Sequence, residues 1–345
     1  MRDADSRHLD LKPWAPPFLM GILAASFQIY LLREFGAEFY GNELIFGLFL
    51  GSWLLWGGLG SLIRPRAKPG VGEVRLAGLY GGAIVLFFAG LVTLRFSHKL
   101  MGILPAELTG LVPALGFALL LSLFLSFPLG HSFALNAGSH RGGVPAVYIL
   151  ESAGSAAAGL MVNFVLIPWL SNWQGAAIVG AAAAAMVLVT MKPGRWKVLP
   201  AAAVGLAVVL AGFDLPSQKA AWKPLSLIEA RDTPYGKLQV IRNREQLTFF
   251  DNALAVFSHP DEGAAEESIH FALLQRHSPR NILLVGGGAS GGVGVAATVN
   301  VVPAALQSVY GSRTPFGALA FFRLRPAFGS DMSEMPGMKM EPNDD

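Results

Sequence analysis

The chain has 345 residues, of which 53% are hydrophobic and only 14% are charged, and its formal net charge is +3. A typical soluble domain is nearer 25% charged, so the composition indicates a membrane protein. The sequence has no cysteine, which excludes disulfides, thiol catalysis and cysteine-ligated metals. The basic residues are confined to particular loops, so they indicate membrane topology rather than a nucleic-acid partner.

A polar segment, residues 1–14, is followed by apolar segments that are long enough to cross a bilayer, which takes about 20 residues per helix. The seventh segment has a second interpretation, a helix lying along the membrane interface. Together the segments predict a transmembrane helical domain over residues 15–214 with the lipid bilayer as partner. The expected spans are 15–33, 43–63, 76–94, 111–134, 147–169, 174–191 and 197–214.

Loop charges predict the orientation. With seven spans, the loops at 64–75, 141 and 192–197 fall on the same side as the N-terminus, and they hold most of the loop lysines and arginines. The positive-inside rule therefore places the N-terminus in the cytoplasm and the C-terminal domain outside, in a periplasm if the cell has one. The outer side then also holds Arg33, Glu34, Glu38, Arg95 and the sequence SNWQ at 171–174.

Small residues are dense at 154–159 (GSAAAG) and 175–185 (GAAIVGAAAAA). Small side chains let membrane helices approach closely, so we expect a packed bundle.

Three polar side chains fall inside the expected spans: Gln28, Glu151 and Asn163. Intramembrane acids are costly and usually face a bundle interior or a water-filled path. Glu151 could therefore handle a solute or a proton, or it could pair structurally near the interface. Four further polar residues form an outer rim between the first two helices, and their position favours anchoring of the helices at the membrane interface. They are Arg33, Glu34, Asn42 and Glu43.

Residues 215–280 are expected to hold a linker (215–224), a small β domain and a helix. Short β-prone runs at 226–258 predict an antiparallel unit with turns at TPYG (233–236) and DNA (251–253). The run 261–277 begins acidic and ends basic, an order that suits a helix dipole. His270 on this helix is a weak candidate base or ligand contact, and the alternative is packing against the β unit.

Residues 281–330 predict an incomplete Rossmann-like segment, because LLVGGGASGG (283–292) combines a buried strand with a glycine turn. Glycine lets the backbone approach a bound nucleoside; the alternative is a vestigial turn. The candidate binding residues are Gly286, Gly287, Gly288, Ser290, Gly291 and Gly292.

The tail at 331–345 is expected to be disordered. Its methionine thioethers could bind Cu(I) as soft ligands, although a plain disordered tail is the simpler interpretation and no metal is expected. These methionines are Met332, Met335, Met338 and Met340.

Several motifs in order resemble the spermidine synthase (polyamine aminopropyltransferase) family, in the bacterial form fused to a transporter-like membrane domain. They cover roughly residues 15–295. In the membrane part they are QIYLLREFGAEFYGNEL (28–44), SWLLWGGLGS (52–61) and YILESAGSAAAG (148–159). In the remainder they are EARDTPYG (229–236), LTFFDN (247–252), PDE (260–262), IHFALL (269–274) and the glycine strand.

The resemblance implies a bacterial inner-membrane protein with a methyltransferase-type α/β domain behind a β domain. It implies aminopropyl transfer from decarboxylated S-adenosylmethionine to putrescine, and a homodimer or larger membrane assembly. The family carries a tyrosine before the helix histidine and an acid in the glycine turn, where this chain has Ile269 and Ala289–Ser290. Because acids must hold the diamine and accept its proton, impaired catalysis is expected. The alternative is a non-enzymatic membrane protein, either a solute transporter or a partner-dependent subunit.

Overall fold

The structure is a computed structural model of the chain. It describes residues 14–41, 43–63, 71–191 and 194–261, with the shorter stretches 263–264, 267, 275, 281–285, 307–309 and 319–323. The chain divides into two compact units, Met1–Val256 and Phe257–Asp345. Each is described by itself.

The described residues of the first unit form seven helices that are long and apolar enough to cross a membrane, so the predicted fold class is confirmed in this part and the chain is an integral membrane protein. A short helix, α4 (Ser97–Leu100), a π turn, η1 (Val162–Leu166), and a 3-10 turn, η2 (Gly194–Lys197), complete the bundle. The long helices are α1 (Ala15–Glu38), α2 (Glu43–Leu62), α3 (Val71–Arg95), α5 (Leu111–Ser139), α6 (Gly143–Met161), α7 (Asn172–Thr190) and α8 (Val198–Ala221).

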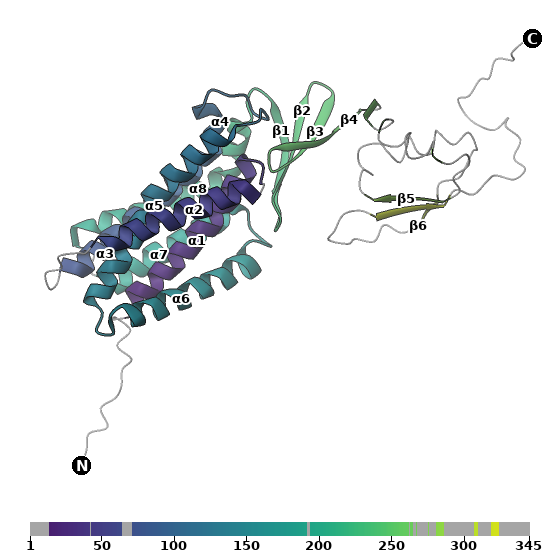
Figure 1. Ribbon diagram of the computed structural model, residues 1–345. Coiled ribbons are helices and arrows are strands. Elements are labelled where there is room, and N and C mark those ends of the chain that lie inside the picture. Colours follow the sequence, from purple (N-terminus) through teal and green to yellow (C-terminus); the bar gives the residue numbers. More distant parts are fainter. Residues whose placement is uncertain are drawn as a thin grey trace, which may run out of the picture. The chain divides into compact units, whose positions relative to one another are not determined.

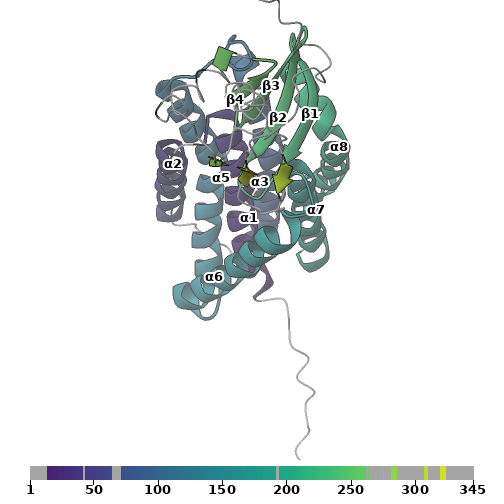
Figure 2. The same ribbon diagram turned by 90° about the vertical axis from the view of Figure 1, so that its right-hand side faces the viewer.

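Helix α1 lies inside the bundle and contacts α2, α3, α5, α6 and α7 (Figure 1). Its Phe27 ring stacks on Phe87 of α3 at 4.1 Å between centroids, and neither side chain is exposed. On the flanks, α2 packs along α5, while α8 packs along α7 and α3 (Figure 2). The buried apolar side chains therefore form one continuous core around α1.

Glycines set the closest helix contacts, as the small-residue motifs predict. A Cβ placed on Gly154 of α6 would overlap the Phe18 carbonyl oxygen of α1, and one on Gly21 would overlap the Glu151 carbonyl oxygen. A Cβ placed on Gly130 of α5 would likewise overlap the Gly57 carbonyl oxygen of α2. These backbones approach because no side chain separates them.

Three helices end later than the sequence indicates, and one of them is α5, which continues to Ser139. Helix α1 continues to Glu38 and α8 continues to Ala221, through residues expected to be loop or linker. The extensions of α1 and α8 carry polar residues, but Glu34, Ser217 and Gln218 are buried and hydrogen-bonded there rather than solvated. Tertiary pairing thus extends helices that hydropathy alone would end.

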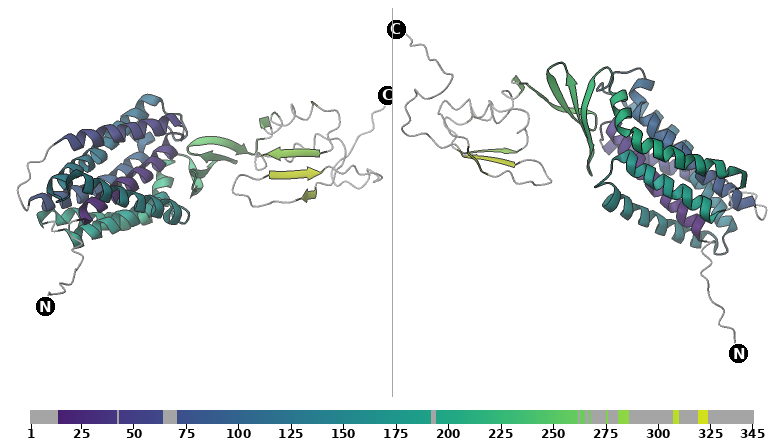
Figure 3. Two further views of the ribbon diagram at one scale, coloured as in Figure 1. Left: turned by 60° about the horizontal axis from the view of Figure 1, so that its bottom comes forward. Right: turned by 180° about the vertical axis from the view of Figure 1, so that it is seen from behind.

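A four-stranded antiparallel sheet follows α8 and lies at one end of the bundle (Figure 3), as predicted for residues 226–258. Its order is β1-β2-β3-β4. Turns form at residues 233–236, where the Thr233 amide bonds the Gly236 carbonyl at 2.8 Å, and at Asn252 and Ala253, which both have positive φ. Positive φ at both central residues suits a two-residue hairpin. The strands are β1 (Ser226–Asp232), β2 (Lys237–Asn243), β3 (Gln246–Asp251) and β4 (Leu254–His259).

In the second unit, β5 (Asn281–Val285) forms at the predicted strand. It pairs antiparallel with β7 (Leu319–Arg323), which pairs antiparallel with β6 (Gln307–Val309). A Rossmann-like sheet is mostly parallel, so that part of the predicted fold is not confirmed. Most of the expected helix, His270, the glycine turn 286–292 and the four tail methionines lie outside the described residues.

Candidate functional site

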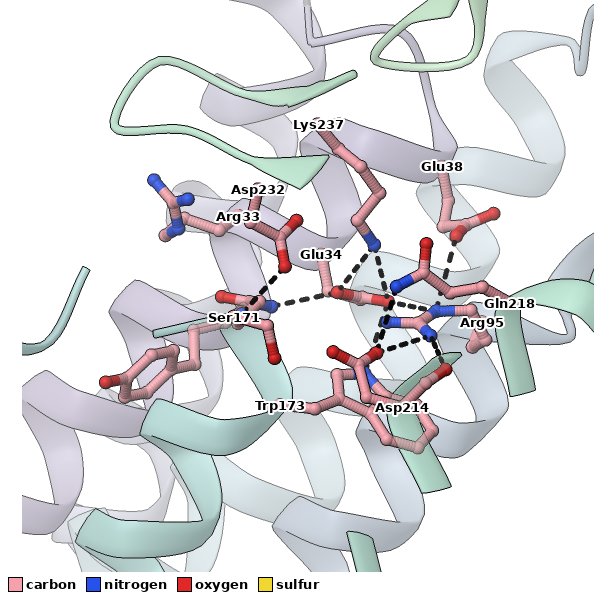
Figure 4. A network of polar contacts seen from close by, with 12 residues as sticks. Arg33, Glu34, Glu38, Arg95, Ser171, Trp173, Asp214, Gln218, Asp232 and Lys237 are labelled. Atoms are coloured by element: carbon pink, nitrogen blue, oxygen red, sulfur yellow. Dashed lines mark hydrogen bonds and ion pairs between the residues drawn. The ribbon is translucent and has the colours of Figure 1, made fainter. Parts of the chain in front are cut away.

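Glu34 is the centre of a buried polar network at the sheet end of the bundle (Figure 4). Its side chain is fully buried, and Arg95 Nε donates to Oε1 at 2.6 Å. Lys237 Nζ lies 3.2 Å from Oε2, and Asn172 Nδ2 donates to Oε2 at 2.8 Å. Trp173 Nε1 donates to Oε1 at 3.3 Å. Both carboxylate oxygens are thus satisfied, as a buried charge requires.

The network forms because four helix ends meet there. Acids near the C-terminal end of α1 oppose the helix dipole, while Arg95 at the end of α3 favours it, so pairing Glu34 with Arg95 stabilises both helix ends. At the start of α7, the Ser171 hydroxyl accepts from the Gln174 amide in a capping box. This cap places Asn172 and Trp173 in the first turn, facing Glu34.

Arg95 joins α1 to α8. Its Nη1 donates to Asp214 Oδ1 at 3.0 Å and to Ser217 Oγ at 2.9 Å. Its guanidinium also lies 4.2 Å from the centre of the Trp173 ring, a favourable cation–π geometry. The arginine charge is therefore balanced by carboxylates from two helices.

The sheet completes the network through the alternation of β2. Successive strand residues point to opposite faces, so Lys237, Gln239 and Ile241 share the buried face. Lys237 reaches Glu34, and Gln239 Nε2 lies 3.5 Å from Gln218 Oε1 of α8. The sheet is thus tied to the bundle by polar contacts as well as by apolar packing.

A second set of contacts holds the β1–β2 turn. Arg33 donates to the Thr233 and Pro234 carbonyl oxygens at 2.7 and 3.1 Å. Asp232 Oδ2 accepts the Asn172 amide at 2.8 Å. The motifs 28–44 and 229–236, singled out separately by the family resemblance, therefore contact each other directly.

A cleft opens beside the network, and we call it the Glu38 cleft. The space that the centres of water molecules can occupy in this cleft is about 30 Å³, which is enough for roughly two water molecules. Its polar lining comprises Glu38, Arg95, His98, Lys99, Gln218 and Gln239; its apolar lining includes Ala106, Ala221 and Trp222.

Polar groups of the Glu38 cleft have unused hydrogen-bonding capacity. Glu38 lies 3.9 Å from Arg95 Nε and 3.8 Å from His98 Nδ1, too far for hydrogen bonds. Arg95 Nη2 and His98 Nε2 are buried and have no hydrogen-bond partner among the described residues. Unsatisfied buried groups are rare in proteins and call for an explanation.

His98 lies on α4, outside the membrane spans. Burial lowers the pKa of its imidazole, while a hydrogen bond with the Glu107 backbone and the Glu107 charge raise it by less. Burial thus favours the neutral imidazole, in which one ring nitrogen is a donor and the other an acceptor.

A larger cleft of about 170 Å³ lies on the other side of Glu34, lined by Arg33, Asn172, Asp232, Tyr235 and Lys237 among others. Within the described part of the chain, no group of three or more histidine, aspartate or glutamate side chains is arranged to hold a metal ion. Both clefts are lined by charged and hydrogen-bonding side chains.

The three intramembrane polar residues do not join the network. Glu151 is half-buried and accepts from Ser155 Oγ at 3.3 Å, and exposed Asn163 donates to the Gly159 carbonyl at 2.8 Å. Gln28 is half-buried. None of the three lines either cleft. The contact of Glu151 lies within α6, and that of Asn163 joins η1 to the end of α6.

The residues expected to form a polar rim between the first two helices have different environments in the structure. Glu34 is buried rather than interfacial and Arg33 binds the sheet, so anchoring is wrong for Glu34. Glu43 is exposed, and Asn42 lies outside the described residues. The spacing of Glu34 and Glu38, four residues apart on one helix face, was the available clue. Asp214 and Lys237 carried no such clue, because nothing in the sequence near either residue pairs it with Glu34.

Comparisons with protein-family models, curated proteins and solved structures find no match to this chain. The spermidine synthase resemblance therefore stays a prediction, and the site is interpreted from its own geometry.

Proposed function

We propose that the membrane domain binds a small polar solute in the Glu38 cleft, as a non-enzymatic transporter or as a membrane subunit that works with other chains. The observation that carries this proposal is that two buried nitrogens, Arg95 Nη2 and His98 Nε2, have no hydrogen-bond partner among the described residues, and that the Glu38 carboxylate beside them has none there either. A bound solute would satisfy all three groups.

Placement supports the same function. Residues from α1, α3, α4 and α8 line the cleft together with the sheet residue Gln239, at the end of a membrane bundle. A solute there would contact several helices and the sheet at once. Binding would therefore be sensed by elements that are far apart in sequence, which a transporter or a signalling subunit requires.

Thiol labelling tests this proposal, because the chain has no cysteine of its own. Ala221→Cys places a thiol on the cleft wall, and Ser226→Cys places one on the exposed edge of β1 as the matched control. A water-soluble maleimide is applied with glycine, acetate, methylamine, inorganic phosphate or putrescine present. At least one of these should slow labelling at position 221 and leave position 226 unchanged; equal rates with all five would refute the proposal.

Aminopropyl transfer from decarboxylated S-adenosylmethionine to putrescine is the second candidate. It is favoured by β5, which ends at Val285, directly before the glycine cluster, where a nucleotide-binding strand would end. Calorimetry with decarboxylated S-adenosylmethionine tests it. We expect saturable binding that Gly287→Asp abolishes, and no heat at millimolar ligand would exclude a nucleoside site.

We also propose a bacterial inner-membrane location with the sheet on the outer side, based on the loop charges. Ser226→Cys reports this orientation. An impermeant maleimide should label it in intact cells of an expression host without an outer-membrane barrier, and labelling only in inverted vesicles would reverse the topology.

A further inference from the structure

The polar groups of the Glu38 cleft differ in which hydrogen-bond partner each lacks, an acceptor or a donor. This difference identifies the chemistry of the solute. In the described part of the chain, Arg95 Nη2 has no acceptor, and His98 Nε2 has none when it carries the proton. The Glu38 carboxylate has no hydrogen-bond donor there, since His98 Nδ1 and Arg95 Nε lie 3.8 and 3.9 Å away. A complementary solute therefore presents an oxyanion to the first two groups and an amine to the third.

Charge balance narrows the class further. The Arg95 charge is already met by Glu34 at 2.6 Å and Asp214 at 3.0 Å. An anion alone would add negative charge beside the acids Glu34, Glu38 and Asp214. A cation alone would add positive charge beside Arg95 and Lys99. A zwitterion adds no net charge and satisfies both kinds of group, so it avoids leaving a buried charge without a partner.

Size and wall chemistry limit the rest of the molecule. The Glu38 cleft leaves about 30 Å³ for the centres of water molecules, so it admits only a solute of a few heavy atoms. Ala106, Ala221 and Trp222 provide an apolar wall, which suits a hydrogen atom or a methyl group.

Resting on the proposed function, we infer that the Glu38 cleft binds a compact zwitterion with adjacent ammonium and oxyanion groups, of the class of glycine and alanine. Glu38 receives the ammonium group, while Arg95 and His98 donate to the carboxylate. The same chemistry occurs in the headgroup of phosphatidylethanolamine, so the experiment must separate a free amino acid from a lipid.

Calorimetry on the full chain in nanodiscs of phosphatidylglycerol tests the inference with glycine, acetate and methylamine. Glycine should bind at least about tenfold more tightly than acetate or methylamine, since each half-molecule forfeits a charge-assisted contact. Phosphatidylethanolamine nanodiscs form the second arm. Unchanged glycine binding there supports a free amino acid, whereas competition assigns the cleft to the lipid headgroup.

Variants locate the site. Glu38→Gln should weaken glycine binding about tenfold, while Glu43→Gln, an exposed acid at the start of α2, should leave it unchanged. Ala221→Leu fills the apolar wall without touching the network and should also abolish binding, so the inference stays testable if Glu38→Gln fails to fold. Equal glycine affinity in all three variants would overturn it.

The two proposals fail differently. If acetate or methylamine protects the thiol of Ala221→Cys while glycine neither protects nor binds, the cleft is a solute site and the zwitterion assignment is wrong. If none of the probes protects the thiol or binds, both proposals fall.

Discussion

Glu34 of α1 and Lys237 of β2 lie 203 positions apart in sequence, yet Lys237 Nζ is 3.2 Å from Glu34 Oε2. The contact joins a membrane helix to the first residue of a strand, and both side chains are buried. A buried charge that loses its partner is strongly destabilising. The sheet is therefore held in place by the same carboxylate that organises the helix ends.

Asp214 should contribute to stability through charge. Its Oδ1 accepts from Arg95 at 3.0 Å and from Gln218 at 3.1 Å. Asp214→Asn keeps the shape but removes the charge, so we expect the free energy of unfolding in detergent to fall by about 1.5–3 kcal/mol. Glu229→Gln, an exposed acid on β1, is the control. Equal stability of the two variants would contradict the assigned pairing.

Gly154 should tolerate no side chain, because a Cβ would overlap the Phe18 carbonyl oxygen. Gly154→Ala must push α6 away from α1, and overpacking of this kind costs about 1–3 kcal/mol. Gly159→Ala lies on the same helix with nothing within 4 Å of its Cβ. Thermal unfolding should separate the two variants, and an unchanged melting temperature for Gly154→Ala would rule out the close α1–α6 contact.

His98 should make the protein less stable in acid. Burial lowers the pKa of His98 in the folded chain below its ordinary value of 6.5, so the unfolded chain binds the proton first as the pH falls through that value. The free energy of unfolding that the neutral imidazole contributes is fully present above pH 6.5. It is lost as the pH falls toward the lower pKa that His98 has in the folded chain. His98→Gln should therefore lose less stability between pH 7 and 5 than the parent chain. Exposed His259→Gln should follow the parent, and identical pH profiles for all three would contradict the burial effect.

Arg33 should order the β1–β2 turn, since its guanidinium spans two carbonyl oxygens at 2.7 and 3.1 Å. Lysine cannot reproduce that forked geometry. With Arg33→Lys we expect faster amide hydrogen exchange at residues 233–236, while Arg231→Lys on the exposed face of β1 leaves the rate unchanged. Equal exchange in both variants would mean that the turn is ordered by its own hydrogen bonds.

The membrane part could be predicted because hydropathy, loop charge and glycine spacing are local properties. All seven spans follow from them, and the turns at 233–236 and 252–253 follow from their turn-forming residues. The continuation of α8 to Ala221 could not, since its polar residues resemble a linker until the buried partner Arg95 is known. The antiparallel pairing of β5 with β7 likewise depends on a segment whose sequence has weak periodicity.

The candidate site was predictable only in part. Seven spans place Glu34, Glu38, Arg95 and residues 171–174 on one side, and the structure brings them together. Sequence could not show that Lys237 enters the same site, because strand alternation fixes which face it shares but not what that face covers. Gln28, Glu151 and Asn163 were selected for their depth in the helices, but depth does not determine convergence.

A double-mutant cycle on Glu34 and Lys237 tests most directly whether the helices and the sheet form one charged site. The free energy of unfolding is measured for Glu34→Gln, Lys237→Met, the double variant and the parent chain. Each single variant should lose about 3–5 kcal/mol by leaving a buried charge unpaired, and the double variant should lose clearly less than the sum. Strictly additive losses would mean that the two side chains do not interact, and the site as described would not exist.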